Sequence, residues 1–181
     1  MGIMAGSSDT QDLAPGDGDA AGDGLPFRRA GRVILLDPDG RVLLMRYDDP
    51  LPNGPHWSTP GGGLEPGEDY RTGARRELAE ETGWTDITLA GEIHRRTIVL
   101  RLGHGRLVRQ HERLFLARTA EPGREITGVD EMHTSDGIAA WRWWSLAELE
   151  STAEKIWPEG LAGLVRTALS RGEPEEEEEG R

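Results

Sequence analysis

The sequence contains no cysteine in its 181 residues. Disulfide bonds, a cysteine nucleophile and a zinc site with cysteine ligands are therefore excluded. No run reaches the roughly 20 apolar residues that a membrane-spanning helix needs. The first residues also lack the basic segment followed by an apolar stretch that marks a secretory signal. We therefore expect a cytoplasmic protein that does not associate with a membrane.

Lysine is nearly absent as well: Lys155 is the only lysine among 21 basic residues. The net charge of -12 is concentrated at the two ends of the chain. Residues 1–26 hold five aspartates and no basic residue, and residues 172–181 hold six glutamates and one arginine, so each segment carries -5. We predict disordered acidic tails there, because these segments have too little apolar surface to offset the entropy of ordering. Residues 27–171 are predicted to form one domain with a charge of about -2.

The first half of the predicted domain contains strands followed by a helix. Apolar and β-branched residues predict strands at 27–36 and 41–46, and the sequence DPDG between them predicts a hairpin turn. After a proline-rich loop, a short strand at 57–59 leads into a proline and three glycines. The helix predicted next spans about 69–82, and Gly83 caps its C-terminal end.

The second half returns to strands and ends in helices. A second hairpin is predicted at 93–118, followed by a polar surface loop at 121–137 and a strand at 139–144. Ser145 and Glu148 form a capping-box pattern that starts a short helix. A last helix spans about 158–170. The order strands, helix, strands, helices favours an α/β sandwich with a mixed sheet.

The predicted helix carries a dense cluster of carboxylates. Glu77, Glu80 and Glu81 stand at positions i, i+3 and i+4, which share one helix face with Cβ atoms about 5–6 Å apart. Three crowded carboxylates repel one another, and a hard divalent cation such as Mg²⁺ reverses that repulsion by taking oxygen ligands. The alternative is a solvated helix face whose charge is reduced by Arg75 and Arg76.

The segment 62–84, GGLEPGEDYRTGARRELAEETGW, resembles the Nudix box, G-x5-E-x7-R-E-U-x-E-E-x-G-U with U a bulky apolar residue. Every fixed position matches, and those positions are Gly62, Glu68, Arg76, Glu77, Glu80, Glu81 and Gly83. The resemblance implies a Nudix-type α/β/α sandwich with a mixed β-sheet. It also implies Mg²⁺-dependent hydrolysis, with Mn²⁺ as a substitute, of the pyrophosphate linkage in a (d)NTP or another nucleotide derivative. A homodimer is a further candidate, because dimers are common in the family.

The resemblance also assigns roles within the box. Glu77, Glu80 and Glu81 correspond to metal ligands that are also catalytic. Arg76 corresponds to the arginine that pairs with the earlier glutamate, Glu68, and holds helix and loop in register; pairing of Arg76 with Glu80 at i+4 is the alternative. The glycines that include Gly62 and Gly63 let the backbone approach a ligand closely.

A further glutamate from outside the box often joins the ligands in the family that the chain resembles. Glu112, on the predicted strand after the second hairpin turn, is our candidate for a metal ligand with a catalytic role. Glu131, in the predicted loop 121–137, is the alternative base or ligand. Either residue could instead be an ordinary surface acid.

The hairpin at 93–118 carries seven arginines and three histidines. Most of them are interpreted as a solvated sheet face, and Arg109 and Arg113 are our candidates for contacts with substrate phosphate. Trp57, just before the glycines, is a candidate for stacking on a base. We expect a small-molecule nucleotide as substrate and no nucleic-acid partner, because the acidic chain would repel a polyanion.

Motifs that mark particular substrates within the family are missing. There is no SQPWPFPxS-like sequence of the NADH pyrophosphatases, no proline about 16 residues past the box as in ADP-ribose pyrophosphatases, and no tyrosine there as in dinucleoside polyphosphate hydrolases. A generic MutT-like group is left. The alternative is a nucleotide-binding sensor or regulator without turnover, a class that usually has a broken box, whereas this box is intact.

Overall fold

A computed structural model describes residues 24–102 and 105–170 of the chain. The predicted tails fall almost entirely outside these residues. One mixed sheet of eight strands organises the fold, with the path β5-β6-β1-β2-β3-β8, while β4 pairs with β1 and β7 pairs with β2. The strands are β1 (Phe27–Leu36), β2 (Val42–Asp48), β3 (Pro55–Ser58), β4 (Gly61–Gly63), β5 (Leu89–Arg101), β6 (Leu107–Arg118), β7 (Ile138–Trp144) and β8 (Ile156–Trp157). Because β1–β6 and β3–β8 are parallel and the other pairs antiparallel, the expected mixed sheet is confirmed.

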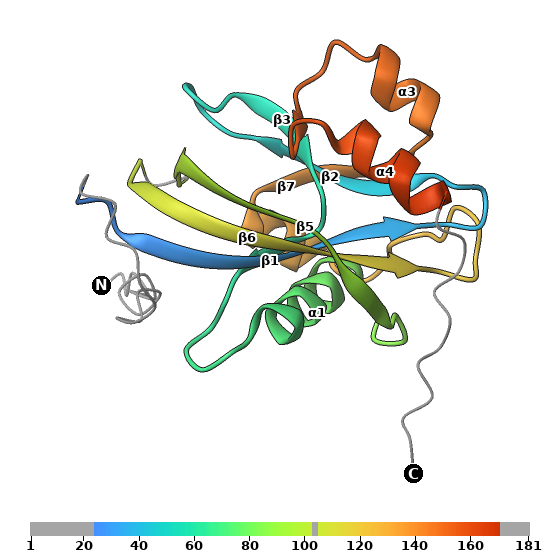
Figure 1. Ribbon diagram of the computed structural model, residues 1–181, viewed down its shortest axis with the longest axis horizontal. Helices are drawn as coiled ribbons and strands as arrows, with labels where there is room; N and C mark the ends of the chain where they lie inside the picture. The colour runs from blue at the N-terminus through green and yellow to red at the C-terminus, as the bar shows by residue number, and fades with distance from the viewer. Residues whose placement is uncertain (1–23, 103–104, 171–181) are drawn as a thin grey trace, which may run out of the picture.

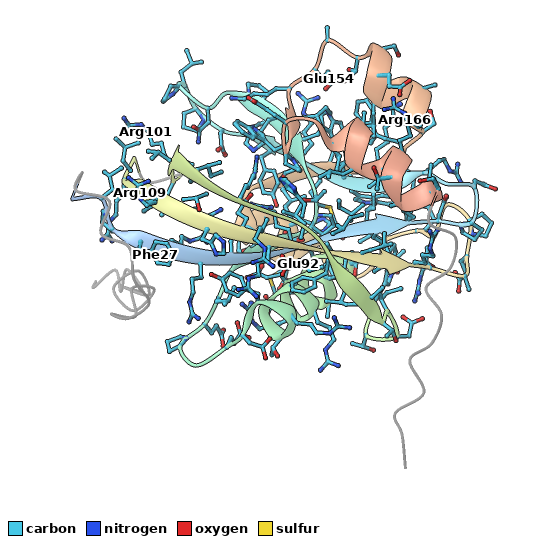
Figure 2. All side chains as sticks on the ribbon, in the orientation of Figure 1. Phe27, Glu92, Arg101, Arg109, Glu154 and Arg166 are labelled. Atoms are coloured by element: carbon cyan, nitrogen blue, oxygen red, sulfur yellow. The ribbon has the colours of Figure 1, made fainter. Side chains whose placement is uncertain are left out.

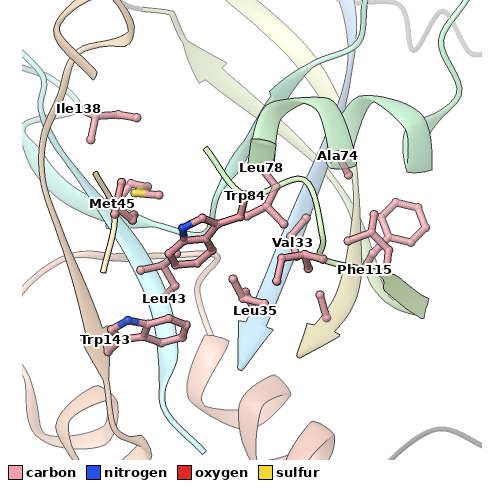
Figure 3. Close-up of a cluster of buried hydrophobic side chains, with 14 residues drawn as sticks. Val33, Leu35, Leu43, Met45, Ala74, Leu78, Trp84, Phe115, Ile138 and Trp143 are labelled. Atoms are coloured by element: carbon pink, nitrogen blue, oxygen red, sulfur yellow. The ribbon is translucent and has the colours of Figure 1, made fainter. Parts of the chain in front are cut away.

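Helices cover both faces of the sheet (Figure 1). They are α1 (Tyr70–Thr82), α2 (Asp130–Asp136), α3 (Leu146–Ser151) and α4 (Leu161–Ser170). Successive side chains of a strand point to opposite faces, so β1 contributes to two separate cores. Val33 and Leu35 pack with Leu78 of α1 in the cluster of Figure 3, whereas Ile34 and Leu36 pack with residues of α3 and α4. The α/β/α sandwich is therefore confirmed.

The predicted first hairpin is present, but its strands pair only beside the turn. The strand β1 pairs with β2 through Leu36 and Val42, next to the turn. Beyond the turn β1 continues between β6 and β4, while β2 continues between β7 and β3. The sheet consequently divides into two halves, and this division makes room for the cavity described below.

The predicted surface loop at 121–137 is wrong in one part, because it contains the helix α2. This helix has no buried residue, so it carries none of the apolar periodicity that reveals a helix in a sequence. The capping box of α3 is confirmed: the Ser145 hydroxyl and the Glu148 carboxylate each accept the other residue's backbone N–H. Among the described residues, no helix has both the length and the apolar character to span a membrane.

Candidate active site

A cavity of about 780 Å³ lies between the two halves of the sheet. Its walls come from β1, β5 and β6 on one side, from Tyr47, His56 and Ser58 on the other, and from the glutamates of α1. The charged residues that line it are Arg28, Arg32, Asp49, Glu77, Glu80, Glu81, Arg96, Arg101, Glu112, Asp136, Lys155 and Glu159. Acidic and basic groups therefore face one shared space.

Local signals at both ends define the helix that brings the glutamates there. Asp69 is the N-cap, and its side chain accepts a hydrogen bond from the backbone N–H of Thr72. Gly83 ends the helix with φ of 75°, a left-handed conformation that glycine adopts without strain, as predicted. Between these caps, the i, i+3, i+4 spacing places Glu77, Glu80 and Glu81 together on the lining of the cavity.

The three glutamates differ in burial. Glu81 is only 2% exposed, and its carboxylate accepts hydrogen bonds from the Gly61 backbone N–H at 2.9 Å and the Tyr47 hydroxyl at 3.1 Å. Burial, together with the nearby charge of Glu77, raises the pKa of Glu81 to about 8. Burial also raises the pKa of Glu77. The Glu80 side chain is the most open of the three, with 39% exposure.

The glycines at 61–63 form the short strand β4 rather than a loop, and they pair with β1. A Cβ atom on Gly62 would come within 2.6 Å of the Glu77 carboxylate, and one on Gly63 within 2.5 Å of the Arg28 guanidinium. A larger residue at either position would displace a charged side chain of the cavity, because the strand passes directly against these side chains. The expected close approach is thus an approach to the protein's own charged groups.

Arg76 connects the glycine strand to the helix. Its guanidinium donates to both carboxylate oxygens of Glu68, at 2.9 and 3.1 Å, and to the Gly63 carbonyl at 2.9 Å. It also donates to Glu77 at 2.9 Å and to Glu80 at 3.0 Å. Hydrogen bonding from Arg76 lowers the pKa of Glu68. Both pairings considered from the sequence, with Glu68 and with Glu80, are present.

The chemistry of this helix face fits a divalent cation. Carboxylate oxygens are the hard ligands that such ions take, and a cation would relieve the repulsion between Glu77 and Glu81. As the side chains stand, no three acidic or histidine groups within 24–102 and 105–170 are arranged to hold a metal ion. Instead, the guanidinium of Arg76 forms ion pairs with both Glu77 and Glu80 and balances their charge. The donor set is therefore chemically suitable for such an ion.

Glu112 lines the same cavity, but its carboxylate already forms ion pairs with two arginines. It is 1% exposed, and Arg32 and Arg96 donate to its two oxygens at 2.8 and 2.5 Å. Gln110 adds a third hydrogen bond at 2.7 Å and accepts one from Arg28. Burial alone would raise the pKa of Glu112, but the two guanidinium groups outweigh it and hold the pKa at about 2. This environment does not support Glu112 as a metal ligand or base.

Three other predicted site residues lie away from the cavity lining. Glu131 is exposed in the first turn of α2. Arg113 is on the opposite face of β6 from Glu112, with its guanidinium 4.5 Å from the Tyr70 ring centroid and 3.7 Å from Glu92. Arg109 lies near the start of β1, where its backbone N–H binds the Pro26 carbonyl (Figure 2). The interpretation of Arg109 and Arg113 as phosphate contacts is corrected, because strand alternation turns both away from the cavity.

The interpretation of Trp57 as a base-stacking platform is also corrected. Trp57 is 6% exposed and packs edge-on against Trp144 at 5.2 Å, in the core beneath α3 and α4. Its neighbours His56 and Ser58 line the cavity, so alternation along β3 turns the indole into the core.

Sequence reasoning missed the arginines that do line the cavity, above all Arg28, Arg32 and Arg96. Arg28 and Arg32 occupy even positions of β1, the parity of the core residues Ile34 and Leu36. That shared parity is the signal that could have found them.

A three-glutamate helix face that meets anchored arginines in one cavity of an α/β/α sandwich is typical of an enzyme that acts on phosphorylated ligands, whose negative charge the arginines complement. The chain belongs to the Nudix family: the model described as "NUDIX domain" matches residues 26–166.

Relatives agree with this membership. An RNA pyrophosphohydrolase of Dinoroseobacter shibae is 36% identical over an alignment 134 residues long, and the aligned parts cover 66% of this chain and 77% of that protein. An RNA pyrophosphohydrolase of Caulobacter vibrioides is 36% identical over 135 residues, covering 70% and 74%. The chain is therefore a pyrophosphohydrolase that cleaves a pyrophosphate linkage, and the expected Nudix chemistry is confirmed. The inactive-regulator alternative receives no support.

Solved structures show the same fold. The MutT protein from Methanosarcina mazei Go1 aligns with a TM-score of 0.61 and 18% identity, over 83% of this chain and 99% of that one. The Ap4A hydrolase of C. elegans, in a binary complex, aligns with a TM-score of 0.54 and 20% identity, over 78% and 96%. At these identities the similarity establishes the fold alone.

Proposed function

We propose that this enzyme is a Mg²⁺-dependent hydrolase of nucleoside polyphosphates, with the cation held by Glu77, Glu80 and Glu81. The observation that carries the proposal is the shared cavity, in which these carboxylates and the arginines of β1 and β5 face the same space. Nudix hydrolases generally use divalent metals, and the oxygen-only donor set suits Mg²⁺, with Mn²⁺ as a substitute.

Different residues of the chain would have different roles in this reaction. Bound Mg²⁺ would neutralise phosphate oxygens and lower the pKa of a coordinated water. Glu81 is oriented by Gly61 and Tyr47. Arg76 ties the helix to β4 through Glu68 and the Gly63 carbonyl. The arginines of the cavity supply positive charge for the phosphate chain.

The nucleoside fits the other part of the cavity. Its apolar lining consists of Ile98, Val99, Leu100, Leu102, Met132 and Trp157. Apolar and aromatic surface of this kind accepts a base, while the polar part fixes the phosphates. One cavity therefore has room for both ends of a nucleotide.

The 5′-triphosphate end of RNA is a second candidate substrate. Relatives that are 36% identical carry the name RNA pyrophosphohydrolase, which favours this candidate. It differs from our expectation that nucleic acid is not a partner. An RNA end carries the same triphosphate as a free nucleotide, so the phosphate-binding residues would serve both substrates.

Phosphate release from a substrate panel tests the proposal, with the reaction coupled to a phosphatase where the product is pyrophosphate or a phosphate ester. The panel contains (d)NTPs, other nucleotide derivatives and a short 5′-triphosphorylated RNA, each with Mg²⁺, Mn²⁺ or EDTA. We expect metal-dependent turnover of at least one triphosphate, and Glu81→Gln should lower it by about 100-fold or more. Glu125→Gln, at an exposed position outside the cavity, is the matched control. Turnover that is equal in EDTA and Mg²⁺, or unchanged in Glu81→Gln, would overturn the metal assignment.

A cytoplasmic location and a homodimer stay predictions. Light scattering coupled to size-exclusion chromatography measures the assembly directly.

A further inference from the structure

We infer that Arg96 binds a phosphate group of the substrate, and that Glu112 is a positioning residue that orients Arg96 and Arg32. This inference rests on the proposed function, because it assigns a role within the same cavity. It gives Glu112 a task different from the metal ligand or base that the sequence suggested.

The hydrogen bonds of Glu112 are the first step of the argument. One oxygen accepts from Arg32 Nε at 2.8 Å and from Gln110 Nε2 at 2.7 Å, and the other accepts from Arg96 Nε at 2.5 Å. A carboxylate offers about four acceptor positions, so three of them are filled. Binding a metal or abstracting a proton would require Glu112 to give up charge-assisted bonds in a buried site, which is costly.

The two arginines held by Glu112 have different surroundings. Arg32 is committed to the protein, since its Nη1 also donates to the Ser58 hydroxyl and to the carbonyls of Thr59 and Gly61. Arg96 uses Nε for Glu112, and its Nη1 and Nη2 form no hydrogen bond with residues 24–102 or 105–170. Arg96 also lines the cavity, so these two terminal nitrogens are the donors available to a ligand.

Trp157 supports Arg96 from a second direction. The Arg96 guanidinium lies 5.4 Å from the centroid of the Trp157 ring, and Lys155 Nζ lies 5.1 Å from the same centroid. Attraction between a cation and an aromatic face fixes the plane of the guanidinium. With Nε anchored and the plane fixed, the side chain keeps little freedom to lose on binding.

The pre-oriented group matches phosphate. A guanidinium presents paired N–H donors that fit two oxygens of a phosphate, and the bonds are charge-assisted. Lys155 adds a second positive charge beside the same ring. A fixed guanidinium with two available donors, in the cavity that holds the acidic helix face, is suited to hold the phosphate chain during cleavage.

Binding measurements without turnover provide the test. The probe is α,β-methylene-ATP, a triphosphate whose α–β linkage resists hydrolysis, titrated calorimetrically into the full-length protein in EDTA and again in Mg²⁺. Arg96→Ala should weaken binding by about tenfold or more in both conditions, because charge-assisted hydrogen bonds are lost. Arg96→Lys should recover part of the affinity. The control is Arg95→Ala, the neighbouring position on the other strand face, where the side chain is 63% exposed and pairs with Glu92.

Arg96→Ala within twofold of the parent would overturn the inference. If the parent binds the probe through Arg96 but releases no phosphate from any panel member, the proposed function fails while the assignment of Arg96 stands. If a triphosphate is turned over strongly and Arg96→Ala leaves that turnover unaffected, the proposed function stands and the assignment of Arg96 fails.

Steady-state kinetics of Glu112→Gln separate a positioning role from the two others. We expect KM to rise, with the Mg²⁺ concentration for half-activation and the shape of the pH profile unchanged. Loss of a pH-profile limb together with kcat would identify a base, and a raised Mg²⁺ requirement would identify a ligand. If Glu112→Gln does not fold, the Arg96 variants still decide the inference.

Discussion

The Glu81 carboxylate accepts the backbone N–H of Gly61 at 2.9 Å, which joins the last turn of α1 to the first residue of β4. The second oxygen of Glu81 accepts the hydroxyl of Tyr47 at 3.1 Å, from β2 in the other half of the sheet. A single buried carboxylate is thus held by both halves of the sheet. Its orientation depends on groups that lie outside the Nudix box.

Tyr47→Phe should impair catalysis without unfolding the protein. The substitution keeps the ring and removes one hydrogen bond to a proposed ligand, a change that typically costs 10- to 100-fold in metal affinity or activity. We expect the Mg²⁺ concentration for half-maximal activity to rise by about tenfold. Tyr70→Phe is the control, because Tyr70 contacts His111 and does not line the cavity. An unchanged Mg²⁺ requirement in Tyr47→Phe would show that Tyr47 does not orient Glu81.

Gly62→Ala should separate activity from stability. The added methyl would meet the Glu77 carboxylate at 2.6 Å, and this is the far end of a flexible side chain that can move away. The fold should therefore persist while Glu77 leaves its position, and we expect activity to fall by about tenfold or more. Gly91→Ala is the matched control, since no atom lies within 4 Å of a Cβ at that position. Thermal unfolding and phosphate release, measured on both variants, check the prediction.

Local patterns in the sequence predicted the helix α1 well, because its signals are all local. The cap residues Asp69 and Gly83 and the spacing of the glutamates lie within a single stretch of chain. The helix α2 was missed because it buries no apolar face; one contact that holds it is the hydrogen bond from His133 Nε2 to the Glu81 carbonyl, across 52 residues. No local pattern contains such a contact.

The sequence-based prediction of phosphate-binding arginines was also limited by contacts between distant segments. A period of two divides the arginines of β5 and β6 into two faces, and the sequence reveals this division. Which face borders the cavity depends on the parallel pairing of β6 with β1, which sets Glu112 opposite Ala30. Because that register joins segments about 80 residues apart, the sequence favoured Arg109 and Arg113, whereas the fold places Arg96 in the cavity. The burial of Trp57 in the core likewise depends on contacts between distant segments, which the sequence does not reveal.

Asp37 should make stability depend on pH in the acidic range. Its carboxylate accepts the backbone N–H groups of Arg41 and Gly123, and the Arg41 side chain, in a buried position between β1 and β2. Burial raises its pKa, but these hydrogen bonds outweigh burial and leave the pKa below the usual 3.8. The stabilisation is therefore fully present above pH 3.8 and is lost as the pH falls through the lowered pKa.

Asp37→Asn should accordingly reduce the free energy of unfolding at neutral pH by about 2 kcal/mol, because donors that met a carboxylate lose it. Urea unfolding at neutral pH and at decreasing acidic pH measures the effect. The difference between parent and variant should shrink as the parent's carboxylate protonates. Asp39→Asn, with a side chain that is 60% exposed, is the control and should change stability little. A difference that stays constant into the acidic range would contradict the role of the charged form.

His111 should produce a second pH dependence, nearer neutrality. Its Nδ1 lies 2.7 Å from the Tyr70 hydroxyl. Burial, followed by the charges of Arg113 and Arg95, lowers its pKa below the usual 6.5. Below pH 6.5 the unfolded chain binds a proton at His111 that the folded protein does not bind. The free energy of unfolding therefore decreases as the pH is lowered from 6.5 to the pKa of His111 in the folded protein, and this contribution is constant at lower pH.

His111→Gln should remove this component, so that stability between neutral pH and about pH 5 becomes flatter than in the parent. Arg113→Gln should reduce it in part, because one of the charges that disfavour the imidazolium is gone. Urea unfolding of the three proteins across this range makes the comparison. Equal slopes in parent and His111→Gln would place the proton uptake elsewhere. Since His111 and Arg113 face α1 and Tyr70, away from the cavity, phosphate release at neutral pH should be nearly the same in all three, which distinguishes this face of β6 from the face that carries Glu112.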